Sequence, residues 1–245
     1  MERKSQAIVL KSVDYGENDK IVLLYSLEEG KFSVTAKGVK KATAKLKYAV
    51  EPFCFGNFTY TESHDRRILT GCEQEESFFA LRENLEKYYG ASACLEVVGA
   101  MEQENESNPS VFVLLLRALK EICFGQIDVY LAIVKFYLEY LTLAGYRLDF
   151  SKCGVCGSTA DRRLYLDLQI GGVVCAYCRS GNAIAISPSV KNALTLISRQ
   201  PFNKLSVLKL NQSELCDCLD LFNSYICHSF TTLKCLKELI KLPKI

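Results

Sequence analysis

The sequence has few of the residues and patterns on which most enzyme active sites depend. Only two histidines, His64 and His228, occur among the 245 residues, and neither is close to a cysteine pair along the chain. No glycine-rich phosphate loop, no GxSxG nucleophile motif and no HExxH metalloprotease motif is present. The sequence therefore contains none of these catalytic motifs.

Long apolar runs are also missing. No run approaches the roughly 18 uncharged apolar residues that a membrane helix needs, and the longest candidate, near residues 111–116, is far too short. The charges near the N-terminus, at Glu2, Arg3 and Lys4, are not followed by the apolar segment of a signal peptide. We therefore expect a cytoplasmic protein with no membrane partner, in which the twelve cysteines stay reduced.

Four of the cysteines form two Cys-x-x-Cys pairs in the pattern C-x2-C-x18-C-x2-C: Cys153, Cys156, Cys175 and Cys178. Each pair can place two thiolates on one metal ion from a tight turn, and the loop between them can close a tetrahedron of four sulfurs. Four protein ligands leave no open position, so the pattern predicts a structural Zn²⁺ site and not a catalytic one. Two disulfides, four unrelated buried cysteines and an iron–sulfur cluster are the alternatives.

Basic charge is concentrated in one short segment, although the net charge of the chain is only +2. Residues 31–50 contain six lysines and no acid, whereas residues 51–76 contain six acids. Lysines in a loop can neutralise nucleic-acid phosphates, which positions a backbone without reading bases; a solvated loop of no special role is the alternative. The candidate nucleic-acid-binding residues are Lys37, Lys40, Lys41, Lys45 and Lys47, with Arg66 and Arg67 in the next turn.

Short strand-like segments fill the chain as far as Ser77. Alternating apolar residues or aromatic runs, bounded by turn residues, predict strands at 7–10, 20–26, 31–36, 53–60 and 68–72. Five short strands suit a small closed barrel such as the oligonucleotide-binding barrel (OB-fold). An SH3-like barrel is of similar size.

Helical periodicity replaces this pattern after residue 77. Apolar stripes and capping residues predict helices at 78–89, 91–101, 109–124, 128–144, 187–199 and 211–242, with an acidic loop at 102–108. The cysteine segment, residues 150–185, interrupts them. The sequence thus predicts an α+β, multi-domain protein: an N-terminal OB-fold β-barrel (residues 1–77) followed by an all-α helical domain (residues 78–245) with an inserted four-cysteine zinc finger.

Several short motifs in this order resemble the bacterial RecO family of recombination mediators. They are AIVL at residues 7–10, YGENDK at 15–20, EGK at 29–31, AKGVKK at 36–41 and PF at 52–53. The resemblance covers essentially the full chain. It is sharpest from Met1 to Phe55 and at the two Cys-x-x-Cys pairs.

The resemblance implies a function that composition does not show. RecO-like proteins bind single- and double-stranded DNA, anneal complementary strands and act with RecR to load RecA onto DNA coated by single-strand-binding protein (SSB), at the nucleoid. Lys37, Lys40 and Lys41 correspond to the family's basic loop, with lysine where many members have arginine. No motif marks the contacts for RecR or for the SSB C-terminal tail. The acidic tail would favour a basic, partly apolar groove on the helical domain.

Two other classes of protein stay open at this point. A thiol-redox or metal-dependent enzyme using the Cys-x-x-Cys pairs predicts a reactive thiol or an open metal site. A zinc-ribbon transcription regulator predicts a recognition helix with a row of base-reading side chains, and the sequence has no such row.

Overall fold

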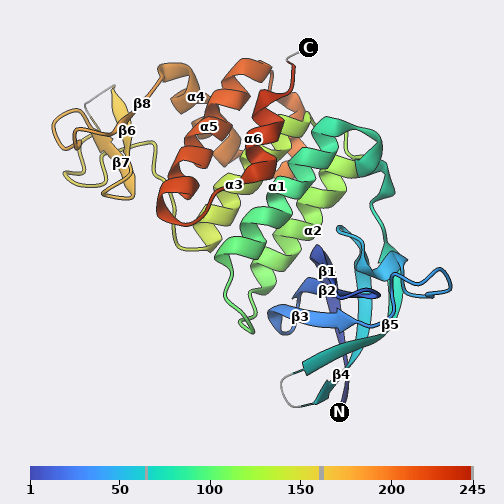
Figure 1. The fold of residues 1–245 in the computed structure, drawn as a ribbon. Helices are drawn as coiled ribbons and strands as arrows, with labels where there is room; N and C mark the ends of the chain where they lie inside the picture. The colour runs from blue at the N-terminus through green and yellow to red at the C-terminus, as the bar shows by residue number, and fades with distance from the viewer. Residues whose placement is uncertain (64–65, 160–162, 244–245) are drawn as a thin grey trace. The chain divides into compact units, whose positions relative to one another are not determined.

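The computed structural model describes residues 1–63, 66–159 and 163–243, and Figure 1 traces the chain from the barrel strands to the helices. The chain packs as two compact units. One contains Met1–Ala80 and Leu95–Leu119, and the other contains Leu81–Cys94 and Lys120–Ile245. The unit that holds the barrel therefore also takes in residues 95–119, which the sequence pattern assigns to the helical domain.

Five strands close into a barrel in the first unit: β1 (Glu2–Tyr15), β2 (Asp19–Ser26), β3 (Gly30–Ala36), β4 (Phe55–Ser63) and β5 (Arg66–Glu76). The order around the barrel is β1-β2-β3-β5-β4, and β1 pairs with both β2 and β4. All neighbours are antiparallel except β3 and β5, which meet in parallel at Thr35 and Ile68. The predicted five-stranded, OB-like barrel is confirmed.

The barrel core follows the alternation in the sequence. In β3, Phe32, Val34 and Ala36 are buried and the residues between them are not, as a period of two requires. A register shift between Val9 and Lys11 interrupts the pairing of β1 with β2. Such a bulge bends a strand and increases its twist, which helps one long strand to serve two neighbours in a closed barrel.

The C-terminal end of α1 (Leu85–Met101) and the segment after it are hydrogen-bonded to β2 and to the β2–β3 hairpin. The backbone N–H of Asn105 donates to the carbonyl of Lys31 at 2.8 Å, and Lys31 Nζ donates to the carbonyl of Gly99 at 2.9 Å. The Tyr25 hydroxyl donates to Glu102 at 3.0 Å, and burial together with this carboxylate raises the pKa of Tyr25 well above its usual range. The sequence predicts only an acidic loop here, because partners so far apart along the chain leave no local pattern.

The second unit is mainly helical, and its core is built on α3 (Val129–Leu143). The other helices of the chain are α2 (Pro109–Phe124), α4 (Pro188–Arg199), α5 (Gln212–Ser229) and α6 (Lys234–Lys241), with 3-10 turns at Tyr48–Val50, Phe79–Glu83 and Phe202–Val207. Ten residues of α3 are buried, and α3 packs against α4 and α5. Lys135 is buried among them, and its ammonium group is satisfied by Glu139 at 2.9 Å and by carbonyls of α4.

Several predicted helix boundaries hold and others do not. Ser187 caps α4, and Asn211 forms a capping box with Glu214 at the start of α5. The helix expected at 78–89 begins only at Leu85, because Asn84 caps it through the N–H of Lys87 and the residues before form a 3-10 turn. It also continues without a break into the one expected at 91–101. The single helix expected at 211–242 is two helices, since the chain leaves helical geometry at Phe230 and resumes it at Lys234.

A small sheet carries the cysteine segment. Its strands are β6 (Leu164–Asp167), β7 (Gly172–Cys175) and β8 (Ile184–Ile186), in the order β7-β6-β8. The Tyr225 hydroxyl of α5 donates to the carbonyl of Gly171 at 3.1 Å and so joins the turn between β6 and β7 to the helices. Within the described residues, no helix has the length and apolar character required to cross a membrane.

Gly30 is a position where the barrel tolerates no side chain. Its φ is +70°, and a Cβ there would lie 1.8 Å from the carbonyl oxygen of Glu106. We predict that Gly30→Ala lowers the free energy of unfolding by roughly 2–4 kcal/mol, because left-handed strain and displacement of the docked segment add. The control is Gly16→Ala, where φ is +63° but nothing lies within 4 Å. It should cost only about 1 kcal/mol. Denaturant unfolding measures both, and equal losses would contradict the close contact.

Candidate metal centre and nucleic-acid surface

The two Cys-x-x-Cys pairs come together in one cluster. The sulfurs of Cys153, Cys156, Cys175 and Cys178 all lie within 4.8 Å of one another, and no other group of three or more possible ligand residues is found within the described ranges. The Cys156 and Cys175 sulfurs are 3.9 Å apart, far from the roughly 2.05 Å of a disulfide. A tetrahedron with Zn–S bonds of about 2.3 Å would separate its sulfurs by about 3.8 Å. All four cysteines are free thiols in the structure, which is against the disulfide alternative, and the donor set fits a metal ion.

Backbone hydrogen bonds bring the two cysteine turns together. In the first turn, the N–H of Gly157 donates to the carbonyl of Cys153 at 2.9 Å, and in the second the N–H of Cys178 donates to that of Cys175 at 3.2 Å. The N–H of Gly154 donates to the carbonyl of Val173 at 2.8 Å, which joins the first turn to β7. The ligands are thus arranged by main-chain contacts that do not involve the metal.

The four thiols differ in burial and acidity. Cys153 and Cys175 are buried, Cys178 is half-buried and Cys156 is exposed. Burial opposes ionisation of Cys153, but hydrogen bonds from the backbone at Cys156, Cys175 and Val155 outweigh it and lower its pKa to about 6. Hydrogen bonds to the sulfurs of Cys175 and Cys156 raise the pKa of Cys178 to about 12. Full ionisation of four adjacent thiols is opposed by their mutual repulsion, which a bound cation relieves.

Asp167 supports this cluster and was not singled out from the sequence. Its buried carboxylate accepts hydrogen bonds from the N–H groups of Gln169 at 3.0 Å, Ile170 at 3.1 Å and Ser180 at 2.6 Å. Burial raises the pKa of Asp167, but these backbone donors outweigh the effect and lower it overall. The side chain connects the turn after β6 with the segment after Cys178. An aspartate at the end of a strand, before a turn, is the one local signal for this role.

The lysine segment between β3 and β4 is an ordered series of turns. Val39 is buried, and Leu46 packs against the barrel core. The N–H of Gly38 donates to the Asp19 carboxylate at 2.7 Å, and the N–H of Lys40 donates to the carbonyl of Asn18 at 3.0 Å. All five predicted lysines of the segment are exposed: Lys37, Lys40, Lys41, Lys45 and Lys47. The barrel thus displays a basic loop that is anchored at both its apolar side chains and its backbone.

One of these lysines has an acidic partner. Lys40 Nζ lies 2.8 Å from the Asp14 carboxylate, and this hydrogen bond lowers the pKa of Asp14. Lys37, Lys41, Lys45 and Lys47 make no ion pair with any residue that the structure describes. Most of the positive charge of the segment is therefore available to a ligand.

Arg67 has a different environment from the lysines. Its side chain is only 16% exposed, and its guanidinium contacts Glu62 at 3.1 Å and Glu29 at 3.2 Å while lying 4.5 Å above the ring of Phe32. Arg66 is exposed at the start of β5. The structure thus places Arg67 inside an ion-pair cluster of the barrel, where its charge is already neutralised. Glu62 lies opposite Arg67 in the β4–β5 hairpin, but Glu29 comes from a remote part of the chain, and that contact has no local sequence pattern.

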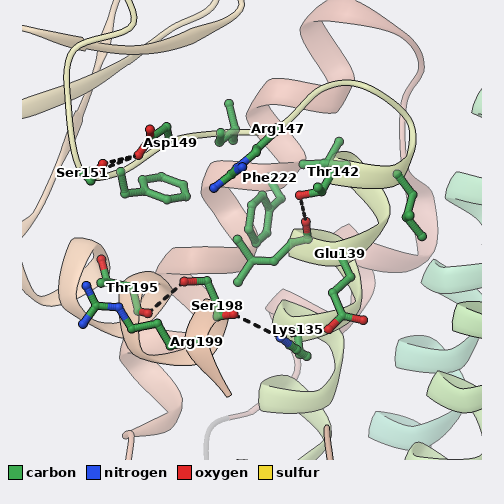
Figure 2. A pocket seen from close by; sticks show the side chains of 15 residues that line it. Lys135, Glu139, Thr142, Arg147, Asp149, Ser151, Thr195, Ser198, Arg199 and Phe222 are labelled. Atoms are coloured by element: carbon green, nitrogen blue, oxygen red, sulfur yellow. Dashed lines mark hydrogen bonds and ion pairs between the residues drawn. The ribbon is translucent and has the colours of Figure 1, made fainter. Parts of the chain in front are cut away.

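A groove of about 580 Å³ opens in the helical unit, between α3, α4, α5 and the loop after α3 (Figure 2). The buried rings of Phe150 and Phe222 lie beneath its surface, and the exposed side chains of Arg147 and Arg199 line it. The two acidic side chains of the groove already have partners within the chain. Glu139 forms an ion pair with Lys135, and the Asp149 carboxylate accepts a hydrogen bond from the Ser151 hydroxyl at 2.5 Å. Sequence reasoning names no residue of this groove, because four separate segments contribute to it.

Comparisons with known proteins agree with this arrangement. The family profile described as Recombination protein O N terminal matches residues 1–78, and the one described as Recombination protein O C terminal matches residues 82–230. The DNA repair protein RecO of Pelotomaculum thermopropionicum is 33% identical over 211 residues, which are 85% of this chain and 82% of that protein. The protein of the same name from Desulforamulus reducens is 30% identical over 226 residues, 91% of this chain and 88% of its own.

A third relative extends over almost the whole length. The DNA repair protein RecO of Clostridium acetobutylicum is 26% identical over 241 residues, 98% of each chain. The two profiles cover both the barrel and the helical part, so the match does not depend on one domain alone. The chain belongs to the RecO family of DNA repair proteins.

Proposed function

We propose that this chain is a DNA repair and recombination mediator that acts by binding and not by catalysis. It binds single- and double-stranded DNA, anneals complementary strands and, with RecR, helps to load RecA onto SSB-coated DNA in the bacterial cytoplasm, at the nucleoid. The observation that carries this proposal is the anchored lysine segment, exposed on the barrel of a RecO-family chain. In this proposal residues 1–77 form the DNA-binding domain and residues 78–245 form the helical domain.

The lysine segment supports annealing for an electrostatic reason. Two complementary strands repel through their phosphates, and lysines that neutralise some of those charges lower the repulsion while the bases pair. Because the segment is already ordered, little conformational entropy is lost when it binds. Lysine contacts do not select a base sequence, which suits a protein that must anneal any pair of complementary strands. Arg66, exposed at the start of β5, is a separate proposed phosphate contact, and Arg67 stabilises the barrel wall.

The cysteine cluster serves the proposed function as a clamp. A Zn²⁺ ion bound by Cys153, Cys156, Cys175 and Cys178 would neutralise thiolate charge and cross-link two turns that a long loop separates in the sequence. Four sulfur ligands leave no position for a substrate or an activated water. This closed donor set favours a structural role over the metal-dependent or thiol-redox enzyme.

The groove in Figure 2 suits the acidic C-terminal tail of SSB. Arg147 and Arg199 would contact the tail's carboxylates, while the accessible apolar lining, Leu138 and Leu143, would receive its apolar end. Glu139 does not oppose such a ligand strongly, because Lys135 lies 2.9 Å away. Asp149 is the acid of the groove that would repel the tail, because hydrogen bonds from Ser151 lower the pKa of Asp149 and keep it ionised.

Removal of three lysines tests the DNA-binding surface. We predict that Lys37→Ala, Lys40→Ala and Lys41→Ala together weaken binding to single strands and duplexes alike and slow annealing of complementary strands, with and without SSB. The slope of log affinity against log salt should become less steep by about 2, because fewer counterions are released. The control changes three exposed lysines elsewhere, Lys204, Lys209 and Lys241, to Ala. An unchanged slope in the first variant would show that the segment does not contact phosphates.

Substitution of two ligands tests the metal centre. We predict that Cys153→Ser with Cys156→Ser reduces metal content from one equivalent to a small fraction and lowers the melting temperature, since binding energy of the ion contributes to folding. Elemental analysis measures the ion and separates zinc from iron. Cys227→Ser with Cys235→Ser, at two half-buried cysteines outside the cluster, is the control and should keep one equivalent. One equivalent in the ligand variant would sink the assignment, and a rapidly titrating thiol in the metal-loaded protein would favour the redox enzyme.

Charge reversal tests the groove. Arg147→Glu with Arg199→Glu should weaken a fluorescent peptide of the SSB acidic tail by roughly 10-fold or more, because two attractive contacts become repulsive. Lys204→Glu with Lys209→Glu, two exposed lysines that do not line the groove, makes the same change in net charge. Fluorescence anisotropy measures both variants. Equal weakening in the two would mean that net charge, and not the groove, attracts the tail.

A further inference from the structure

Each of the two cysteine turns displays an apolar side chain at its tip. Tyr177, between Cys175 and Cys178, is 95% exposed, and Val155, between Cys153 and Cys156, is 57% exposed. The four flanking sulfurs lie within 4.8 Å of one another, so the two tips project from one compact cluster. The structure thus presents an almost fully exposed aromatic ring on a short turn whose two ends are both fixed.

The exposed charged side chains in the described part of the cysteine segment are of one sign. In the described part of the cysteine segment, residues 150–159 and 163–185, the exposed charged residues are Lys152, Arg163 and Arg179. The one acid in these ranges, Asp167, is fully buried and bonded to backbone N–H groups. The Arg179 guanidinium lies 4.6 Å above the ring of Tyr165, so it is held next to the second turn. Four thiolates on a divalent ion carry a formal charge of −2, which the three cations exceed.

We propose that this tip, defined by Tyr177 and Val155 and flanked in the sequence by Lys152 and Arg179, is a second nucleic-acid contact that takes an unpaired base. The base stacks on the ring of Tyr177 against Val155, and the two cations contact the flanking phosphates. The inference rests on the proposed function and deepens it. The lysine segment attracts any phosphate backbone, whereas the tip distinguishes a single strand from a duplex.

The chemistry of the tip favours a base over other ligands. Unpaired bases offer a free aromatic face, and base–aromatic stacking contributes about 1–3 kcal/mol per base without sequence preference. In a duplex each base is already stacked between its neighbours and offers no such face. A protein partner is less well matched, because two side chains alone supply far less than the roughly 800 Å² that each side of a stable interface buries. The fixed turn also limits the entropy lost on binding.

The test uses the metal-loaded full chain with Tyr177→Ala. Binding is measured to a labelled single strand and to a duplex of the same sequence, at several salt concentrations. Single-strand affinity should fall roughly 5- to 150-fold, duplex affinity should stay the same, and the salt slope should not change, because stacking releases no counterions. Tyr177→Phe keeps the ring and should bind like the unchanged protein. Fluorescence of 2-aminopurine in the single strand should be quenched by both ring-bearing forms and not by Tyr177→Ala.

The matched control is Phe79→Ala, which removes an exposed ring (64%) outside the cysteine segment and should leave both affinities unchanged. Metal content and melting temperature verify that each variant is folded. Unchanged single-strand affinity in Tyr177→Ala, or equal loss for single strand and duplex, overturns the inference. If the triple lysine variant still loses affinity in that case, the proposed function stands without the tip. If the unchanged protein binds neither DNA, both proposals fail.

Discussion

The pairing of β1 with two neighbours at once closes the barrel, and the features of the barrel unit depend on it. The first half of β1, residues 2–8, pairs with β4, and its second half, residues 7–15, pairs with β2, with a bulge between Val9 and Lys11 that allows the bend. Closure removes free strand edges and fixes where each connecting loop leaves the wall. The lysine segment leaves between β3 and β4, and the residues after α1 dock on the β2–β3 hairpin. Neither could be held in place on an open, sliding sheet.

The cations of the barrel divide into two groups according to their surroundings. Arg67 is surrounded by Glu29, Glu62 and the ring of Phe32, and it stabilises the wall. A planar guanidinium suits this position, because it can contact two carboxylates and a ring together. The lysines of the segment are exposed, and only Lys40 has an acidic partner among the residues that the structure describes. A cationic side chain can thus either stabilise the fold or remain available to a ligand. Its burial and its acidic partners decide between these two roles.

The cysteine module shows how a metal site can be prepared by the main chain. Hydrogen bonds join the first turn to β7, Asp167 joins the turn after β6 to the segment beyond Cys178, and Tyr225 joins the module to α5. These contacts position four sulfurs near tetrahedral spacing, so the ion completes a nearly formed cluster. The same rigidity leaves the tip residues Val155 and Tyr177 exposed to solvent.

The sequence by itself determined the features that have a local physical cause. Alternation with a period of two predicts the barrel strands, a short polar side chain before a helix predicts the caps of α4 and α5, and the spacing of two Cys-x-x-Cys pairs predicts the sulfur cluster. Only the tertiary structure decided what depends on distant partners. In the folded chain Arg67 contacts the remote Glu29, and residues 99–108 pack against the barrel. The last predicted helix is two helices, and four separate segments form the groove of Figure 2. Local geometry repeats in the sequence at fixed spacings, whereas contacts between remote segments have no fixed spacing and become visible only when the chain is folded.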